Sequence, residues 1–127
     1  MSERATGTFT TAFEPLSSDD ESIGRMRVRK TIEGDLTGTG VAEMMSVGTA
    51  VEGSAGYVAI DRITGTLAGR SGSFVLQHFG LMARGIGTLT VSVVPDSGTA
   101  GLTGLTGLFD IVNEAGVHSY TFDYDLP

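Results

Sequence analysis

The stretch that decides the fold is Gly65-Thr-Leu-Ala-Gly-Arg-Ser-Gly-Ser-Phe-Val-Leu-Gln-His-Phe-Gly80. Apolar residues on both sides of a glycine-rich centre predict the end of one strand, a tight turn, and a second strand. The second strand carries Gln77 and His78 side by side within an apolar run. This β-hairpin indicates an antiparallel sheet, and its two polar residues are the strongest chemical clue in the chain.

The rest of the sequence repeats this pattern of short strands and turns. The 127 residues include 19 glycines without a collagen-like period, and glycine disfavours helices. No window has a convincing 3.6-residue apolar period. We predict strands at about 6–14, 24–36, 40–52, 57–67, 73–82, 86–94, 108–112 and 117–126, with a helical turn within 99–107.

Eight antiparallel strands at this spacing are typical of a sandwich or a barrel. We favour a closed antiparallel eight-stranded β-barrel that forms a single domain over residues 1–127, because the connections read as successive hairpins and closure removes exposed edges. An aromatic stripe of Tyr120, Phe122 and Tyr124 shares one strand face with His118. Together with Phe9 and Phe13 of the first strand, we expect this stripe to form the closing seam.

Composition excludes several classes of function. The net charge of −7 argues against nucleic acid and anionic membrane surfaces as partners. Arg25, Arg27 and Arg29 recur at every second position, which favours the solvated face of one strand over an anion-binding patch. The chain has no cysteine and only two histidines, so we expect no disulfide, metal or other cofactor. The absence of a signal peptide or a long apolar segment favours a cytoplasmic protein.

The register of the hairpins determines which side chains face the barrel lumen. We predict two-residue loops at Gly38-Thr39, Gly53-Ser54 and Gly69-Arg70, which bring the apolar faces of neighbouring strands together. The resulting lumenal face also carries four polar residues, of which an arginine is suited to a ligand carboxylate. The predicted ligand-binding residues are Lys30, Glu43, Met45, Arg62, Val75, Gln77 and Phe79. The alternative is that the polar side chains satisfy one another and fill the lumen.

The same register places Asp61 directly opposite His78 on the outer face. A carboxylate that orients an imidazole is the beginning of general-base chemistry, but we favour a cross-strand polar pair on a surface. Around this pair the outer face of strands 57–67 and 73–82 is rather apolar, which predicts a homo-oligomer. A hairpin loop of odd length would exchange the two faces and make Asp61 and His78 the pair to test first.

With these residues assembled, the chain resembles the domain of unknown function 3224 family over nearly its whole length. This resemblance implies a small eight-stranded barrel like that of allene oxide cyclase, and it brings no established reaction. The stretches that carry it are Lys30-Thr31, Gly34-Asp35-Leu36, Glu43-Met44, Gly65-Thr66-Leu67, Gly69-Arg70, Gly72-Ser73-Phe74-Val75-Leu76-Gln77-His78, Val94-Pro95-Asp96-Ser97-Gly98-Thr99, Leu105-Thr106-Gly107, and Tyr120, Tyr124 and Leu126-Pro127 at the end.

Three functional hypotheses follow. The first is a barrel that binds a small, largely apolar or carboxylate-bearing molecule in its lumen. The second is an isomerase or cyclase acting on such a molecule, in which Glu43 or His78 moves a proton. The third is a filled barrel with a structural role in assembly. The sequence leaves open whether the protein is an enzyme.

Overall fold

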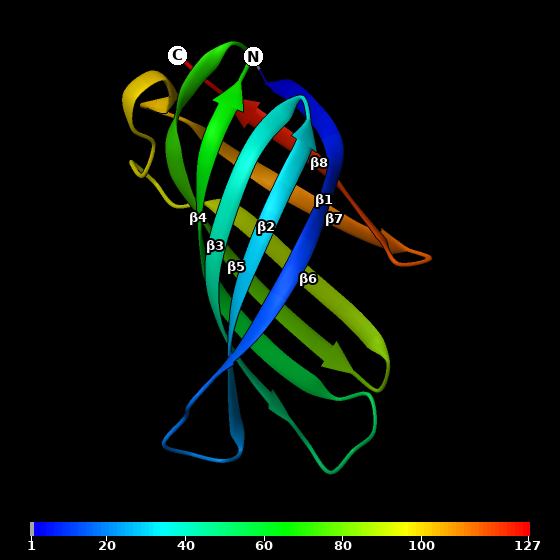
Figure 1. Ribbon diagram of the computed structural model, residues 1–127. Helices are drawn as coiled ribbons and strands as arrows, with labels where there is room; N and C mark the ends of the chain where they lie inside the picture. Colours follow the sequence, from blue (N-terminus) through cyan, green and yellow to red (C-terminus); the bar gives the residue numbers. More distant parts are fainter. Residues whose placement is uncertain (1) are drawn as a thin grey trace.

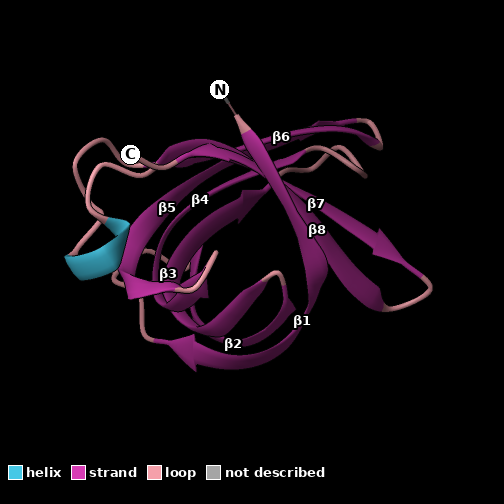
Figure 2. Cartoon of the chain, turned by 90° about the horizontal axis from the view of Figure 1, so that it is seen from above, coloured by secondary structure: helices cyan, strands magenta, loops and turns pink. Residues whose placement is uncertain are grey.

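A computed structural model describes residues 2–127, which form eight strands around one closed barrel. Neighbouring strands are antiparallel and follow the chain order, and β1 pairs with β8 to close the sheet (Figures 1 and 2). The predicted fold class is therefore confirmed, as are the helical turn and the β1–β8 seam, except that Phe13 lies beyond the residues of β1 that pair with β8. The elements are β1 (Glu3–Leu16), β2 (Ile23–Gly34), β3 (Leu36–Gly48), β4 (Ala55–Leu67), β5 (Arg70–Ala83), β6 (Ile86–Val93), the 3-10 helix η1 (Ala100–Leu102), β7 (Thr106–Glu114) and β8 (Val117–Asp125).

The hydrophobic core fills only one end of the barrel, the upper end in Figure 1, where both chain termini lie. Phe74 stacks on Phe122 with ring centroids 5.8 Å apart, and Phe109 stacks on Tyr120 at 5.0 Å. The segment around η1 closes this end, because its Leu102 is completely buried. Aromatic packing and this plug leave no room for a ligand at the upper end.

The barrel wall is least complete between β6 and β7. These strands pair only at Ser92 and Leu108 within the described chain, whereas β7 and β8 pair continuously from Thr106 and Asp125 to Glu114 and Val117. The β7–β8 hairpin therefore projects away from the barrel (Figures 1 and 2). Below the pair Ser92 and Leu108, β6 and β7 form no further strand pairing within residues 2–127.

The connection between β2 and β3 differs from the predicted loop at Gly38-Thr39. The last residue pair of this hairpin is Ile32 with Gly38, so an odd number of residues (33–37) separates the paired strands. The Tyr120 hydroxyl accepts a hydrogen bond from the Leu36 N–H at 3.0 Å and donates to a carbonyl oxygen of the same connection. Thr6 also exchanges hydrogen bonds with Asp35, through its N–H at 2.9 Å and its carbonyl oxygen at 3.0 Å.

This odd-length connection exchanges the inner and outer faces of β3, β4 and β5. The predicted lumenal face was correct for β2, where Val28, Lys30 and Ile32 point inward. It was wrong for the six other predicted site residues, which lie on the outer face of the barrel. These are Glu43, Met45, Arg62, Val75, Gln77 and Phe79.

The two other predicted loops are also displaced. Leu67 pairs with Arg70 and Gly48 with Ala55, so Ala68-Gly69 forms the β4–β5 turn and residues 49–54 connect β3 to β4. Both shifts move the register by an even number of residues, so the same faces of β3, β4 and β5 still lie on one side of the sheet. Consequently Asp61 pairs with Leu76 and not with His78, but both polar residues move to the inside of the barrel.

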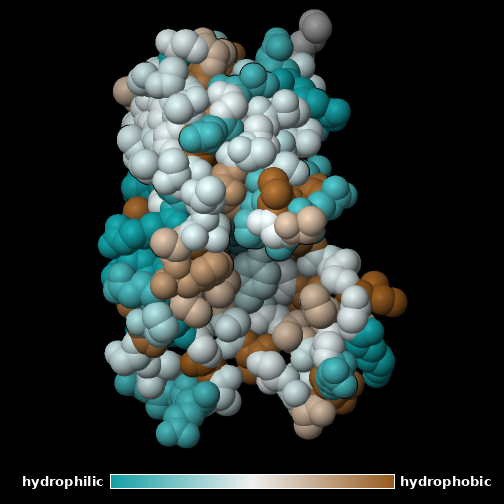
Figure 3. All heavy atoms as spheres, turned by 45° about the vertical axis from the view of Figure 1, so that its right-hand side comes forward, coloured by the Kyte–Doolittle hydropathy of each residue, from teal (hydrophilic) through white to brown (hydrophobic). Residues whose placement is uncertain are grey.

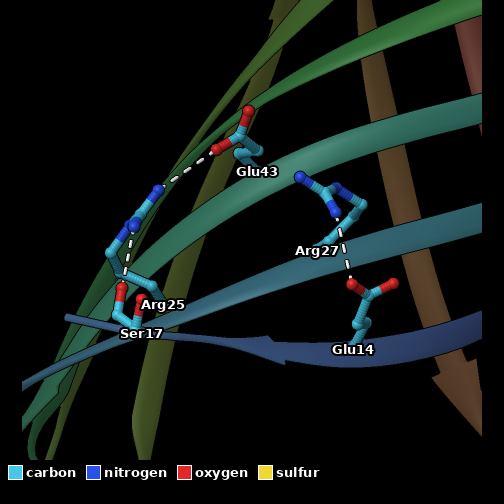
Figure 4. A network of polar contacts seen from close by, with 5 residues as sticks. All are labelled: Glu14, Ser17, Arg25, Arg27 and Glu43. Carbon is cyan, nitrogen blue, oxygen red and sulfur yellow. Dashed lines mark hydrogen bonds and ion pairs between the residues drawn. The ribbon is translucent and has the colours of Figure 1, made fainter.

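The arginines of β2 lie on the outer face, as predicted. Arg25 donates to Glu43 of β3 at 3.3 Å and to the Ser17 carbonyl oxygen at 2.8 Å, and Arg27 donates to Glu14 of β1 at 3.2 Å (Figure 4). Glu43 thus serves as a partner for an exposed arginine. No helix among the described residues has the length and apolarity needed to cross a membrane.

Candidate functional site

The lower half of the barrel contains two adjoining cavities. The outer cavity has a volume of about 490 Å³ and is lined by residues of β3, β4, β5 and β6, among them the inward-facing Met44, Gly80 and Met82. The inner cavity has a volume of about 200 Å³ and shares Met44, Tyr57 and Leu89 with the outer one. On the side shown in Figure 3, the surface is hollowed in the lower half of the molecule, with hydrophobic side chains on both sides of the hollow.

Tyr57 lines both cavities because a glycine lies beside it. A Cβ atom at Gly80 would collide with Cε1 of Tyr57, so the aromatic ring occupies the space beside this position of β5. Burial raises the pKa of the Tyr57 hydroxyl, which therefore stays neutral across the physiological range. The wall between the cavities is thus aromatic and uncharged.

A polar cluster of Lys30, Asp61 and His78 borders the inner cavity. Lys30 of β2 donates to Oδ2 of Asp61 at 2.6 Å, and Nε2 of His78 lies 3.2 Å from the same oxygen. The side chains are 10%, 0% and 5% exposed, respectively. Three strands therefore bring one carboxylate, one ammonium and one imidazole together inside an otherwise apolar barrel.

The neighbours of Asp61 keep its carboxylate ionised. Burial is the largest single influence and works to raise the pKa of Asp61. The hydrogen bond from His78 and the charge and hydrogen bond of Lys30 outweigh it, and the pKa is lowered below its ordinary value. Because the acceptor is an anion, Nε2 of His78 carries the proton in this hydrogen bond, so that Nδ1 presents a lone pair when the imidazole is neutral.

Several polar atoms of the cluster have unused hydrogen-bonding capacity. Oδ1 of Asp61 is the only buried side-chain N or O atom in residues 2–127 that has no hydrogen-bond partner. This oxygen lies beside Gly40, where a Cβ atom would come within 3.1 Å of it. Lys30 donates only to Asp61 among the described residues, and its Nζ lies 5.2 Å from the ring centroid of Phe9. His78 Nδ1 forms no hydrogen bond with any of them.

His118 is a further residue of the inner cavity that the predicted site did not include. Its ring stacks on Phe9 with centroids 5.1 Å apart, across the β1–β8 seam. Its place on the aromatic face with Tyr120 was visible in the sequence, and that face proved to be lumenal. The described residues contain no group of three His, Asp or Glu side chains arranged to hold a metal ion.

The arrangement can therefore do two things chemically. The outer cavity can take up apolar surface, while Lys30 and His78 offer polar atoms at its inner end. His78, oriented by Asp61, also has the geometry of a general base. Of the predicted ligand-binding residues, only Lys30 lies in this cluster, and the alternative pair Asp61 and His78 forms the rest of it.

Comparisons with known proteins agree with the fold. The sequence profile of a family described as "Protein of unknown function (DUF3224)" matches residues 5–124. The chain is also similar to the crystal structure of a protein of unknown function from the DUF3224 family of Shewanella oneidensis MR-1, with 42% identity and a TM-score of 0.94. This similarity covers 100% of the present chain and 99% of that one. No curated protein matches, and the likeness to allene oxide cyclase stays a prediction.

Proposed function

Because the chain belongs to the DUF3224 family, whose description assigns no function, we propose from its cavities that it binds a small, largely apolar molecule in the hollow end of the barrel. The supporting observation is the apolar outer cavity of about 490 Å³, which adjoins an inner cavity that the buried polar cluster borders. Small-molecule sites are commonly concave, about 300–1,000 Å³ in volume, and mostly apolar with a few placed polar groups.

The affinity should come mainly from burial of the apolar part of the ligand. Each buried methylene group contributes about 0.8 kcal/mol, or about a fourfold gain in affinity. A series of alkan-1-ols should therefore bind more tightly with every added carbon until the cavity is filled. Beyond that length, further carbons should add little, because they remain in water.

Two adjacent methionines of β3 provide a matched test. Met44 lines both cavities, whereas Met45 is 45% exposed on the outer face. Met44→Trp should fill the cavity and weaken the binding of the uncharged dye Nile red at least about tenfold, as measured by fluorescence titration. Met45→Trp should bind the dye as the unmodified protein does.

The outcome of this comparison decides the site. If Met44→Trp binds Nile red normally, or if Met45→Trp is the variant that loses binding, the cavity is not the binding site. Far-UV circular dichroism of both variants establishes that the barrel is intact, so that lost binding is not confused with unfolding.

A second candidate function is proton transfer on the bound molecule, as an isomerase or cyclase would require. It is favoured by the hydrogen bond between His78 and the ionised Asp61, which orients the imidazole as a general base. Glu43 has no place in this scheme, because it lies on the outer face and pairs with Arg25.

Hydrogen exchange tests this activity without knowledge of the natural substrate. The protein should speed deuterium incorporation next to the carbonyl group of a 2-alkanone in D₂O, as followed by NMR. His78→Asn should abolish the acceleration while Nile red still binds. An unaccelerated exchange with the unmodified protein, at ketone concentrations that displace the dye, would count against the enzyme.

A further inference from the structure

The buried polar cluster limits the kind of polar group that the inner cavity can accept. Lys30 and Asp61 carry opposite charges and are 2.6 Å apart, so their charges cancel when His78 is neutral. The remaining titratable side chains that line the cavities are His118 and Tyr57. Tyr57 is uncharged, and His118 is stacked on Phe9 without an acidic partner among the described residues. With both imidazoles neutral, this surface therefore offers no net positive charge to an anion.

The hydrogen-bonding atoms that remain consist of donors and an acceptor. Lys30 has three N–H groups and uses one on Asp61, while its side chain lines the inner cavity. His78 uses Nε2 on Asp61 and has a lone pair available at Nδ1. Nδ1 forms no hydrogen bond, and Asp61 Oδ1 is the only fully buried side-chain N or O atom of residues 2–127 without a partner. Nδ1 is therefore exposed at the cavity surface, where a bound molecule can reach it. Lys30 and His78 together therefore complement a ligand group that both accepts and donates a hydrogen bond.

From this juxtaposition we infer that the ligand carries an uncharged hydroxyl group, whose oxygen accepts from Lys30 and whose hydrogen is donated to His78 Nδ1. This inference rests on the proposed function and specifies its ligand class as an apolar alcohol. A carboxylate would also accept from Lys30, but it would face the His78 lone pair and the nearby Asp61 anion. Both interactions are repulsive in a cavity of low dielectric constant. We therefore propose a hydroxyl group in place of the carboxylate that the sequence predicted.

Competition between two probes of equal chain length tests the ligand class. Octan-1-ol and octanoate are titrated against protein-bound Nile red at pH 8, where the acid is ionised. Octanol should displace the dye at a concentration at least about tenfold lower than octanoate, the factor expected for one satisfied hydrogen bond against one repelled charge.

Two variants locate the effect at the cluster. Lys30→Met should remove the donor and reduce the affinity for octanol about tenfold, whereas Arg29→Met, at the neighbouring outward position of β2, should leave it unchanged. Asp61→Asn should shift the preference at least about tenfold toward octanoate, because it leaves the Lys30 charge uncompensated. If Asp61→Asn does not fold, the comparison of the two probes on the unmodified protein remains decisive.

The possible failures are distinguishable. Displacement by octanoate at equal or lower concentration than octanol overturns the hydroxyl inference but leaves the cavity as a binding site. An unchanged affinity of Lys30→Met for octanol would also overturn the hydroxyl inference and leave the cavity as a binding site. If Nile red does not bind, or neither compound displaces it, the proposed function itself fails, and the inference with it.

Discussion

Asp61 is the residue on which the inner cavity depends, because it is completely buried and is the shared partner of Lys30 and His78. Removing one member of a buried ion pair leaves the other charge without compensation, which costs more than the pair contributed. The role of Asp61 is therefore structural as well as chemical, and its substitution affects both stability and ligand preference.

We expect Asp61→Asn to lower the free energy of unfolding by about 3–5 kcal/mol, the range for a broken buried pair. The measurement is equilibrium unfolding in urea at pH 7. Asp110→Asn serves as the control, since Asp110 is exposed on β7 and its loss should change stability by no more than about 0.5 kcal/mol. Equal unfolding free energies of Asp61→Asn and the unmodified protein would show that the buried Lys30 ammonium does not need the Asp61 carboxylate for stability.

The lowered pKa of Asp61 also predicts a dependence of stability on pH. Its folded-state pKa lies below the ordinary value of 3.8. The unfolded state therefore takes up the proton first as the pH falls, and the stabilisation present above about pH 4 is lost between that value and the folded pKa. Asp20 and Asp123 also have lowered pKa values, through hydrogen bonds from Ser22 and Arg4. Both are exposed, and both are present in the unmodified protein and in Asp61→Asn alike.

Unfolding free energies measured from pH 7 to pH 2.5 separate these contributions. The unmodified protein should lose more stability below pH 4 than Asp61→Asn does, because only the former has the buried carboxylate. Parallel curves for the two proteins would mean that Asp61 does not account for the acid sensitivity.

At the scale of elements, the β2–β3 connection determines the inner surface of half the barrel. Its odd length turns β3, β4 and β5 over relative to β2, which brings Asp61 and His78 to the inside. The connection is fixed from outside its own hairpin, by Tyr120 of β8 and Thr6 of β1. Closure of the barrel and the register of this hairpin therefore depend on each other.

Tyr120→Phe tests this link, since it removes the hydroxyl that serves Leu36 and Glu33 and leaves buried backbone groups without a partner. The expected loss in unfolding free energy is about 1–3 kcal/mol. Tyr124→Phe is the matched control, because Tyr124 is similarly buried on the same strand face but forms no hydrogen bond through its hydroxyl within the described chain. Equal effects of the two substitutions would contradict the role of the Tyr120 hydroxyl.

For the whole molecule, the outer wall of β3, β4 and β5 is unusually apolar. Ile60 is 53% exposed, Phe79 52% and Leu81 52%, and Met45 and Val47 extend this surface across β3. The face that was expected to be covered, which carries Asp61 and His78, is the lumenal one, because its apolar residues belong to the core: Ile63, Leu67, Phe74 and Leu76. The face that is outside is apolar nevertheless, and monomers rarely expose a contiguous patch of this kind.

We expect a second copy of the chain to cover this wall. The same face carries Arg62 and Glu43, so two copies related by a twofold axis can place opposite charges together. Light scattering at micromolar concentration should give at least the mass of a dimer, and Ile60→Glu should give a monomer. Thr39→Glu, on the outer face of β3 away from these apolar residues, is the control and should keep the assembled mass. A monomeric unmodified protein would contradict the expectation.

The sequence by itself determined the fold class, the strands, the β1–β8 seam and the inward face of β2. These follow from local patterns, since alternation, glycine turns and an aromatic stripe are properties of neighbouring residues. It also singled out Gln77 and His78, without deciding which of them faces the lumen.

Only the tertiary structure decided that question. Both faces of β4 and β5 are apolar enough to pass for the inside, so the pattern alone did not distinguish them. The decision came from the five residues between the last β2–β3 residue pair (33–37), held by hydrogen bonds from strands that are distant in the sequence. The hollow at the lower end is likewise a result of closure, since a cavity exists only where walls from many strands meet.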